Sequence, residues 1–132
     1  MKYFSLLILS FFTFFSSCND KNKTIEPPGD LQCEYLIDPL GIDVVLPRLS
    51  WKLSPNGSFT KQTAYQILVA DNLNDLKNNT GNLWDTKRVE SDQSTQLKYL
   101  GKKLESRQKV YWKIRVWDQD NKVSDWSKVA TW

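Results

Sequence analysis

Two carboxylates, Glu90 and Asp92, are the residues of this sequence that come nearest to a pair for general acid and base chemistry. Residues two apart on an extended strand have Cα atoms about 6.5 Å from each other, which suits two carboxyl groups with a water molecule between them. The same spacing occurs on many solvated strand edges, and a domain of this size has little room for the enclosed pocket that shifts a carboxyl pKa. We therefore predict that this pair is not catalytic, and the chain carries no other recognisable catalytic residue.

Few residues of this chain could act as a catalytic nucleophile. The chain has no histidine, so triads, metal sites and pH switches that depend on an imidazole are excluded. Cys33 lies in an alternating segment in which Leu31, Cys33 and Tyr35 share one face. Nothing beside Cys33 would lower the pKa of its thiol, so we interpret it as a buried core thiol.

The segment that begins at Asp118 lacks the full pattern of a calcium-binding loop. Asp118 and Asp120 resemble the opening of a calcium-binding loop, but Lys122 occupies a ligand position and Val123 the glycine position. The segment is better interpreted as a plain turn, and we predict neither a metal nor a cofactor.

The strand predicted over 109–118 carries the candidate binding face. Its even-numbered residues from 110 to 116 are apolar and are predicted to face the core. The other side of the strand then carries Lys113, Arg115 and Trp117, and Trp126 from the following strand is expected beside them. Three interpretations remain open. Trp126 stacks on Arg115 as a cation–π pair, Trp117 packs against a neighbouring module, or the face binds sugar rings by stacking.

Positive charge is spread thinly along the chain. The net charge is +3, and acidic residues are interspersed among the basic ones, which argues against a nucleic-acid partner. A local cluster does occur near a predicted turn, at Lys102, Lys103, Arg107 and Lys109. We interpret it as a solvated loop, with contact to an acidic glycan as the alternative.

The N-terminus has the features of an export signal. Lys2 precedes an apolar run over 3–15, which ends in Ser16, Ser17 and Cys18, as at the cleavage site of bacterial lipoproteins. We predict a lipoprotein signal peptide at 1–17, lipidation of Cys18 and a flexible tether over 18–30 rich in polar residues and proline. This places the chain on the periplasmic face or the surface of a bacterium; the alternative is an ordinary signal peptide with an incidental cysteine.

The remaining chain, 31–132, is predicted to be one all-β module. The 132 residues include 40% hydrophobic and 25% charged residues, which is ordinary for one soluble domain, but six tryptophans are many. Trp51 and Trp112 fall on core faces by alternation. A turn is predicted at 55–58, and a short turn or helix within 72–81. About seven short strands indicate an antiparallel β-sandwich, and they are expected at 31–36, 49–53, 65–69, 83–89, 94–99, 109–118 and 124–132.

Several blocks of this module resemble a fibronectin type III or immunoglobulin-like domain, and more specifically the N-terminal domain of bacterial α-L-rhamnosidases. The resemblance runs from Leu31 to Trp132 and is carried by the segments 33–43, 47–51, 62–70, 89–94 and 111–118. Val110 departs from the pattern, since sandwiches of this type often place the tyrosine of a tyrosine corner there.

The resemblance implies a non-catalytic accessory module, a fragment of a lipid-anchored glycoside hydrolase that removes terminal α-L-rhamnose. The partners it implies are the downstream catalytic modules, the membrane through the lipid, and a glycan. The alternative is a self-sufficient surface lipoprotein that binds carbohydrate or protein. A reading frame that continues past Trp132 favours the first, and a stop codon with no rhamnosidase fragment beside it favours the second.

Overall fold

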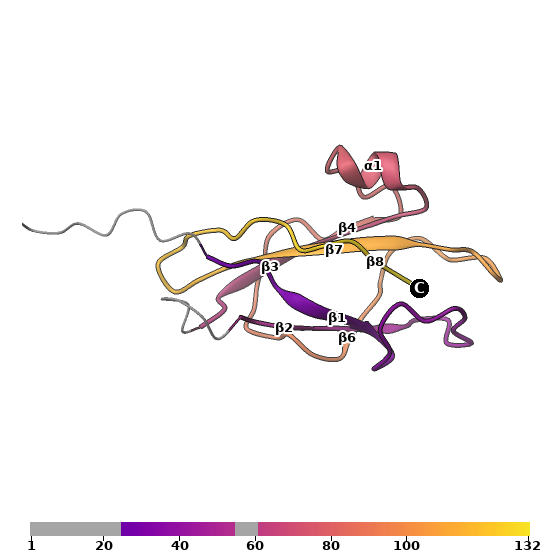
Figure 1. Ribbon diagram of the computed structural model, residues 1–132, viewed down its shortest axis with the longest axis horizontal. Coiled ribbons are helices and arrows are strands. Elements are labelled where there is room, and N and C mark those ends of the chain that lie inside the picture. Colours follow the sequence, from indigo (N-terminus) through magenta and orange to yellow (C-terminus); the bar gives the residue numbers. More distant parts are fainter. Residues whose placement is uncertain (1–24, 55–60) are drawn as a thin grey trace, which may run out of the picture.

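The computed structural model describes residues 25–54 and 61–132, which form two packed antiparallel sheets (Figure 1). One sheet has three strands in the order β1 (Gly29–Cys33), β2 (Arg48–Lys52) and β6 (Leu97–Lys98). The other has five, in the order β4 (Trp84–Asp85), β3 (Ala64–Ala70), β7 (Tyr111–Trp117) and β8 (Ala130–Thr131), with β5 (Val89–Glu90) also paired to β3. The antiparallel β-sandwich predicted from the alternation is therefore confirmed.

The core between the sheets includes the even-numbered residues from 110 to 116 and Trp51, which alternation assigned to it. Val110, Trp112, Ile114 and Val116 are at most 1% exposed, and Trp51 is 2% exposed. The indole of Trp51 meets the Tyr65 ring of the opposite sheet edge to face, with ring centroids 5.5 Å apart. Such contacts across the two sheets make one continuous core.

The buried Tyr99 makes a polar contact with the loop that follows β6. Its hydroxyl donates to the carbonyl of Lys102 at 2.7 Å, and burial raises the pKa of Tyr99 to about 12. Val110 is fully buried, and its backbone pairs with Trp132 in both directions. An aliphatic residue at 110 thus fills the core without a hydroxyl.

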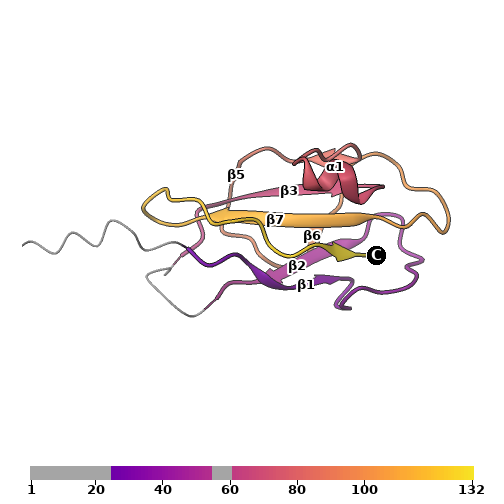
Figure 2. The same ribbon diagram turned by 45° about the horizontal axis from the view of Figure 1, so that its top comes forward.

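A single helical turn covers the outer face of the five-stranded sheet. α1 (Leu73–Lys77) begins at Asn72, whose side chain accepts the N–H of Asp75, and it ends before Asn79, which has a φ of 57°. Leu76 of α1 packs on Leu68 and is fully buried. Figure 2 shows the helix lying over this sheet, so both faces of β3 are covered. Of the turn or helix expected within 72–81, the structure contains the helix.

The N-terminal boundary differs from the prediction. β1 begins at Gly29, two residues before the expected start of the module at 31, and Ile25 is 6% exposed, whereas Glu26, Pro27, Gly29 and Asp30 are exposed. β1 also ends earlier than expected, because Glu34 and Tyr35 have positive φ and turn the chain. Tyr35 is therefore 60% exposed and does not share the buried face of Cys33, as the alternation had predicted.

The last predicted strand is regular only at its end. Upstream of β8 the chain follows β7 through two serines, Ser124 and Ser127, whose hydroxyls accept the N–H groups of Val116 and Ile114. The N–H groups of the same serines donate to the carbonyls of Val116 and Ile114. The two serines thus supply hydrogen bonds to β7 where a regular neighbouring strand would otherwise supply them. The predicted signal peptide, Cys18 and the predicted turn at 55–58 lie outside the described residues.

Candidate functional site

The four residues of the candidate binding face lie together on the outer side of β7, in a stack of alternating cations and rings. The Arg115 guanidinium is 4.6 Å from the ring centroid of Trp126 and 5.2 Å from that of Trp117. The Lys113 Nζ lies 4.9 Å from the Trp126 ring, and the Arg88 guanidinium lies 5.0 Å from the Trp117 ring. We call these five side chains the cation–π stack. Of the three interpretations, the pairing of Arg115 with Trp126 is thus confirmed.

Two members of the stack are less accessible than the sequence predicted. Trp117 is 9% exposed and Lys113 is 7% exposed. Arg88 and Arg115 both lie against Trp117, and the Asn79 side chain, just after α1, accepts a hydrogen bond from Lys113 Nζ at 2.5 Å. Trp117 and Lys113 therefore lie on the outer side of β7, as the alternation indicates, but both are buried there.

Lys113 and Arg115 both donate hydrogen bonds to neutral side-chain amides of the domain. Gln66 Oε1 accepts hydrogen bonds from Arg115 Nε and Nη2 at 3.0 and 2.8 Å. Burial, and then the charge of Arg115, lowers the pKa of Lys113. Sugar stacking needs an open ring face beside polar groups that are free to bind hydroxyls. The geometry therefore favours a stabilising contact between β7 and the segment that carries Trp126.

We expect Trp126→Ala to lower the free energy of unfolding by about 1–2 kcal/mol, because it removes two cation–π contacts at a partly desolvated site. Trp126→Phe, which keeps a ring, should lose less. Urea denaturation followed by circular dichroism measures both variants. An unchanged midpoint for Trp126→Ala, together with lost binding of a saccharide that the wild type binds, would identify the stack as a sugar platform instead.

The carboxylates singled out as an acid and base pair lie in the open. Glu90 on β5 has a side chain that is 68% exposed and forms an ion pair with Arg88 at 2.6 Å, and Asp92 is exposed in the loop after β5. Asp118 is buried, and its Oδ1 accepts the N–H groups of Asp120 and Lys122, both at 2.9 Å. This carboxylate caps a turn, as predicted.

The other chemically interesting residue is shielded. Cys33 is 1% exposed, and burial, with the nearby Glu34 charge as a second cause, raises the pKa of its thiol to about 12. The thiol is protonated at neutral pH and lacks the reactivity of a thiolate, as expected for a core cysteine. Within residues 25–54 and 61–132, no three His, Cys, Asp or Glu side chains gather into a group that could hold a metal. The same described part contains no helix with the length and apolar character needed to cross a bilayer.

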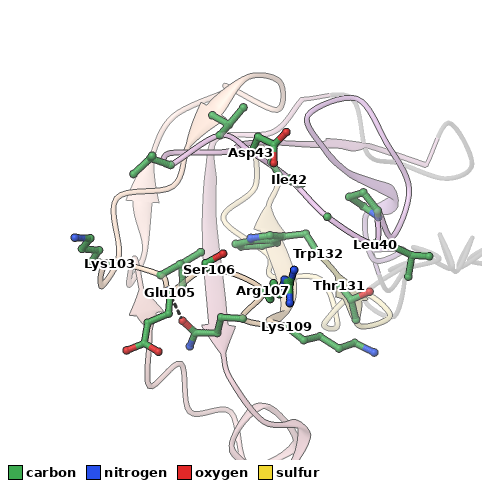
Figure 3. Close-up of a pocket in the computed structure, with 16 residues that line it drawn as sticks. Leu40, Ile42, Asp43, Lys103, Glu105, Ser106, Arg107, Lys109, Thr131 and Trp132 are labelled. Carbon is green, nitrogen blue, oxygen red and sulfur yellow. Dashed lines mark hydrogen bonds between the residues drawn. The ribbon is translucent and has the colours of Figure 1, made fainter.

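A groove lies at the end of the sandwich where β8 ends (Figure 3). Its volume is about 630 Å³, and its walls are the segments 39–45 and 103–109, with Thr131 and Trp132 between them. Three residues of the basic cluster, Lys103, Arg107 and Lys109, line one side. The basic cluster could be identified from the sequence. The groove could not, because its two walls are far apart along the chain.

Comparisons with known proteins agree with this architecture. The family model of the Rha78A-like, N-terminal immunoglobulin domain matches residues 28–132. An α-L-rhamnosidase of Formosa agariphila is 40% identical over 126 residues, which cover 94% of this chain and 14% of that protein. An α-L-rhamnosidase of an Alteromonas species is 42% identical over 98 residues, which cover 74% of this chain and 10% of that protein.

Solved structures give the same result. The structure of an α-L-rhamnosidase from Dictyoglumus thermophilum superposes with a TM-score of 0.79 at 41% identity, covering 84% of this chain and 12% of that chain. The Streptomyces avermitilis α-L-rhamnosidase, complexed with L-rhamnose, superposes with a TM-score of 0.75 at 36% identity, covering 80% of this chain and 10% of that one. The chain thus spans only 10–14% of the length of these relatives.

Proposed function

The chain belongs to the family of Rha78A-like, N-terminal immunoglobulin domains, and from this membership we propose that it is the non-catalytic N-terminal accessory module of an α-L-rhamnosidase-like glycoside hydrolase. The observation that carries the proposal is the coverage: 94% of this chain aligns with 14% of a relative named α-L-rhamnosidase. The substrate of the whole enzyme is then a glycan or glycoside with terminal α-L-rhamnose. The module contributes spacing and docking.

The chemistry of glycoside hydrolysis supports a division of labour between modules. The reaction needs two carboxyl groups on opposite sides of a sugar-sized cleft, one of them with a raised pKa. Glu90 and Asp92 are exposed, and the Glu90 carboxylate is paired with Arg88. In the proposal the further modules of the same polypeptide supply the acid and the base.

Two measurements test this function. The domain of residues 25–132 should leave a chromogenic α-L-rhamnoside intact. Grafted in place of the matching domain of the Formosa agariphila enzyme, it should restore the Tm and the half-life that this enzyme loses when its N-terminal domain is deleted. Turnover by the isolated domain that disappears in Glu90→Gln or Asp92→Asn contradicts the proposal, and so does an enzyme that is unaffected by deletion of the domain.

The module is also proposed to be exported and anchored to a bacterial membrane through Cys18. Support comes from the sequence alone: an apolar run over 3–15, two serines and then the cysteine. A diacylglycerol on the thiol, together with an acyl chain on the amino group, supplies the two hydrophobic anchors that stable binding needs.

We expect Cys18→Ser to move the protein from the membrane to the soluble fraction and to abolish incorporation of labelled palmitate. Ser17→Ala is the matched control, because it keeps a small residue before the cysteine and should leave both properties unchanged. Membrane fractionation that is identical for Cys18→Ser and the wild type, with no palmitate in either, would show that the cysteine is incidental.

A further inference from the structure

We propose that residues 35–46, which we call the docking loop, and the groove beside them bind the module that follows this domain in a rhamnosidase polypeptide. The partner surface is apolar, with carboxylates along one edge. This inference rests on the proposed function and adds the place and the chemistry of the contact.

The docking loop concentrates exposed apolar side chains. Among the described residues, seven of the eleven large hydrophobic side chains that are exposed lie in it. Leu40 is 106% exposed and Val45 is 73% exposed. The full set in the loop is Tyr35, Leu36, Ile37, Leu40, Val44, Val45 and Leu46. Single exposed apolar residues are ordinary, whereas a cluster of this kind is typical of an interaction surface.

The loop is held in place at both ends. Cys33 and Leu36 exchange two backbone hydrogen bonds of 2.9 Å, which close the turn at its start. The Glu34 carboxylate accepts hydrogen bonds from the guanidinium and the backbone N–H of Arg48, at 2.7 and 2.6 Å for the shortest of each. The loop therefore presents its apolar side chains on a backbone that is already ordered, which lowers the entropic cost of binding.

The far side of the loop is tied to the last strand. Asp38 Oδ1 accepts the N–H of Thr131 in β8 at 2.8 Å. Figures 1 and 2 both show the loop beside the C-terminal end of the chain. A module joined after Trp132 would thus start next to the docking loop. The relatives are long enough to hold such modules, since this chain covers 14% of the Formosa agariphila enzyme.

The groove gives the contact an apolar floor and a charged wall. Ile42, Leu104 and Trp132 line the groove; Ile42 and Leu104 are partly buried against the core, and Trp132 is 8% exposed. Figure 3 shows Ile42 and Trp132 in this position. The wall over 103–109 contains three cationic residues, Lys103, Arg107 and Lys109, and one carboxylate, Glu105. Carboxylates on the facing module would complement this wall.

The experiment uses the graft into the Formosa agariphila enzyme and changes the surface alone. Leu40→Asp with Val45→Asp should lower the Tm of the grafted enzyme by several degrees and raise hydrogen–deuterium exchange in the docking loop. Both side chains are exposed in the free domain, so the isolated variant should unfold at the wild-type temperature. The matched control is Leu73→Asp with Val123→Asp, an exposed Leu on α1 and an exposed Val in the turn after β7. This control should leave the Tm of the grafted enzyme unchanged.

Each other outcome overturns the inference in a distinguishable way. If the wild-type graft stabilises the enzyme and the loop variant does so equally, the docking surface lies elsewhere while the proposed function stands. If the wild-type graft itself gives no stabilisation, the proposed function fails as well. A concentration-dependent dimer of the isolated domain that Leu40→Asp dissociates would assign the surface to a second copy. Binding of polygalacturonate that Arg107→Glu abolishes would assign the groove to an acidic glycan.

Discussion

Trp51→Ala is expected to lower the free energy of unfolding by about 3–5 kcal/mol, which is comparable to the whole stability of a small domain. Trp51 is 2% exposed and lies between the sheets against Tyr65, so its removal leaves a cavity that crosses the core. Its indole N–H also donates to Gln62 Oε1 at 3.0 Å, and Gln62 is itself buried. The variant should be largely unfolded at room temperature by circular dichroism.

Two further variants help to separate the effect of the cavity on the free energy of unfolding from the effect of the lost hydrogen bond. Trp51→Phe keeps an aromatic ring but leaves the Gln62 oxygen without its donor, for which we expect a loss of about 1–3 kcal/mol. Trp126→Ala removes an indole of the same size from the outer face and should cost clearly less than Trp51→Ala. If Trp51→Ala had the urea midpoint of the wild type, both the alignment of β2 and the position of the core would be wrong.

Gly81→Ala is expected to destabilise the domain by about 1–3 kcal/mol through steric overlap with the backbone. A Cβ at this position would lie 2.1 Å from the carbonyl oxygen of Trp84 and 3.2 Å from the backbone nitrogen of Val69. Both atoms belong to paired strands, β4 and β3, so relief of the overlap requires the sheet to shift. A lower urea midpoint with an unchanged slope is the expected measurement.

Gly41→Ala is the matched control for this steric prediction. Nothing lies within 4 Å of a Cβ built at Gly41, so we expect a change of less than about 0.5 kcal/mol. Equal midpoints for the two variants would contradict the close approach at Gly81. A large loss for Gly41→Ala would show that the docking loop is more tightly constrained than its contacts indicate.

The errors of sequence-based prediction have two physical sources. The alternation through Cys33 did not anticipate positive φ at Glu34 and Tyr35, which ends β1 and turns the Tyr35 ring to the solvent. The alternation of β7 placed Trp117 on the outer face, which is right, but the burial of that ring depends on Arg88 in a different segment. A local pattern predicts which face of a strand a side chain lies on. Whether that face is covered depends on residues that are distant in the sequence.

The candidate site could be predicted only in part for the same reason. Four of the five residues of the cation–π stack were identifiable, three of them because they share one face of β7, whereas Arg88 was not identified. The apolar residues of 35–46 are visible in the sequence, but their exposure to solvent could not be predicted. Apolar residues in a sequence are normally assigned to a core. The groove beside Trp132 had no signal in the sequence, because its walls are formed by segments about 60 residues apart.

The sequence by itself determined the class of sandwich, the core tryptophans Trp51 and Trp112, and membership of the rhamnosidase module family, because these follow from period-two alternation and from short blocks in order. Tertiary structure alone decided that Lys113 is buried beneath Asn79, and that the docking loop is tied to β8 by a bond between Asp38 and Thr131, 93 residues apart. Such contacts depend on how the two sheets pack and how the loops close over them. No local pattern encodes that arrangement, and it is what sets which charged and apolar groups remain available to a partner.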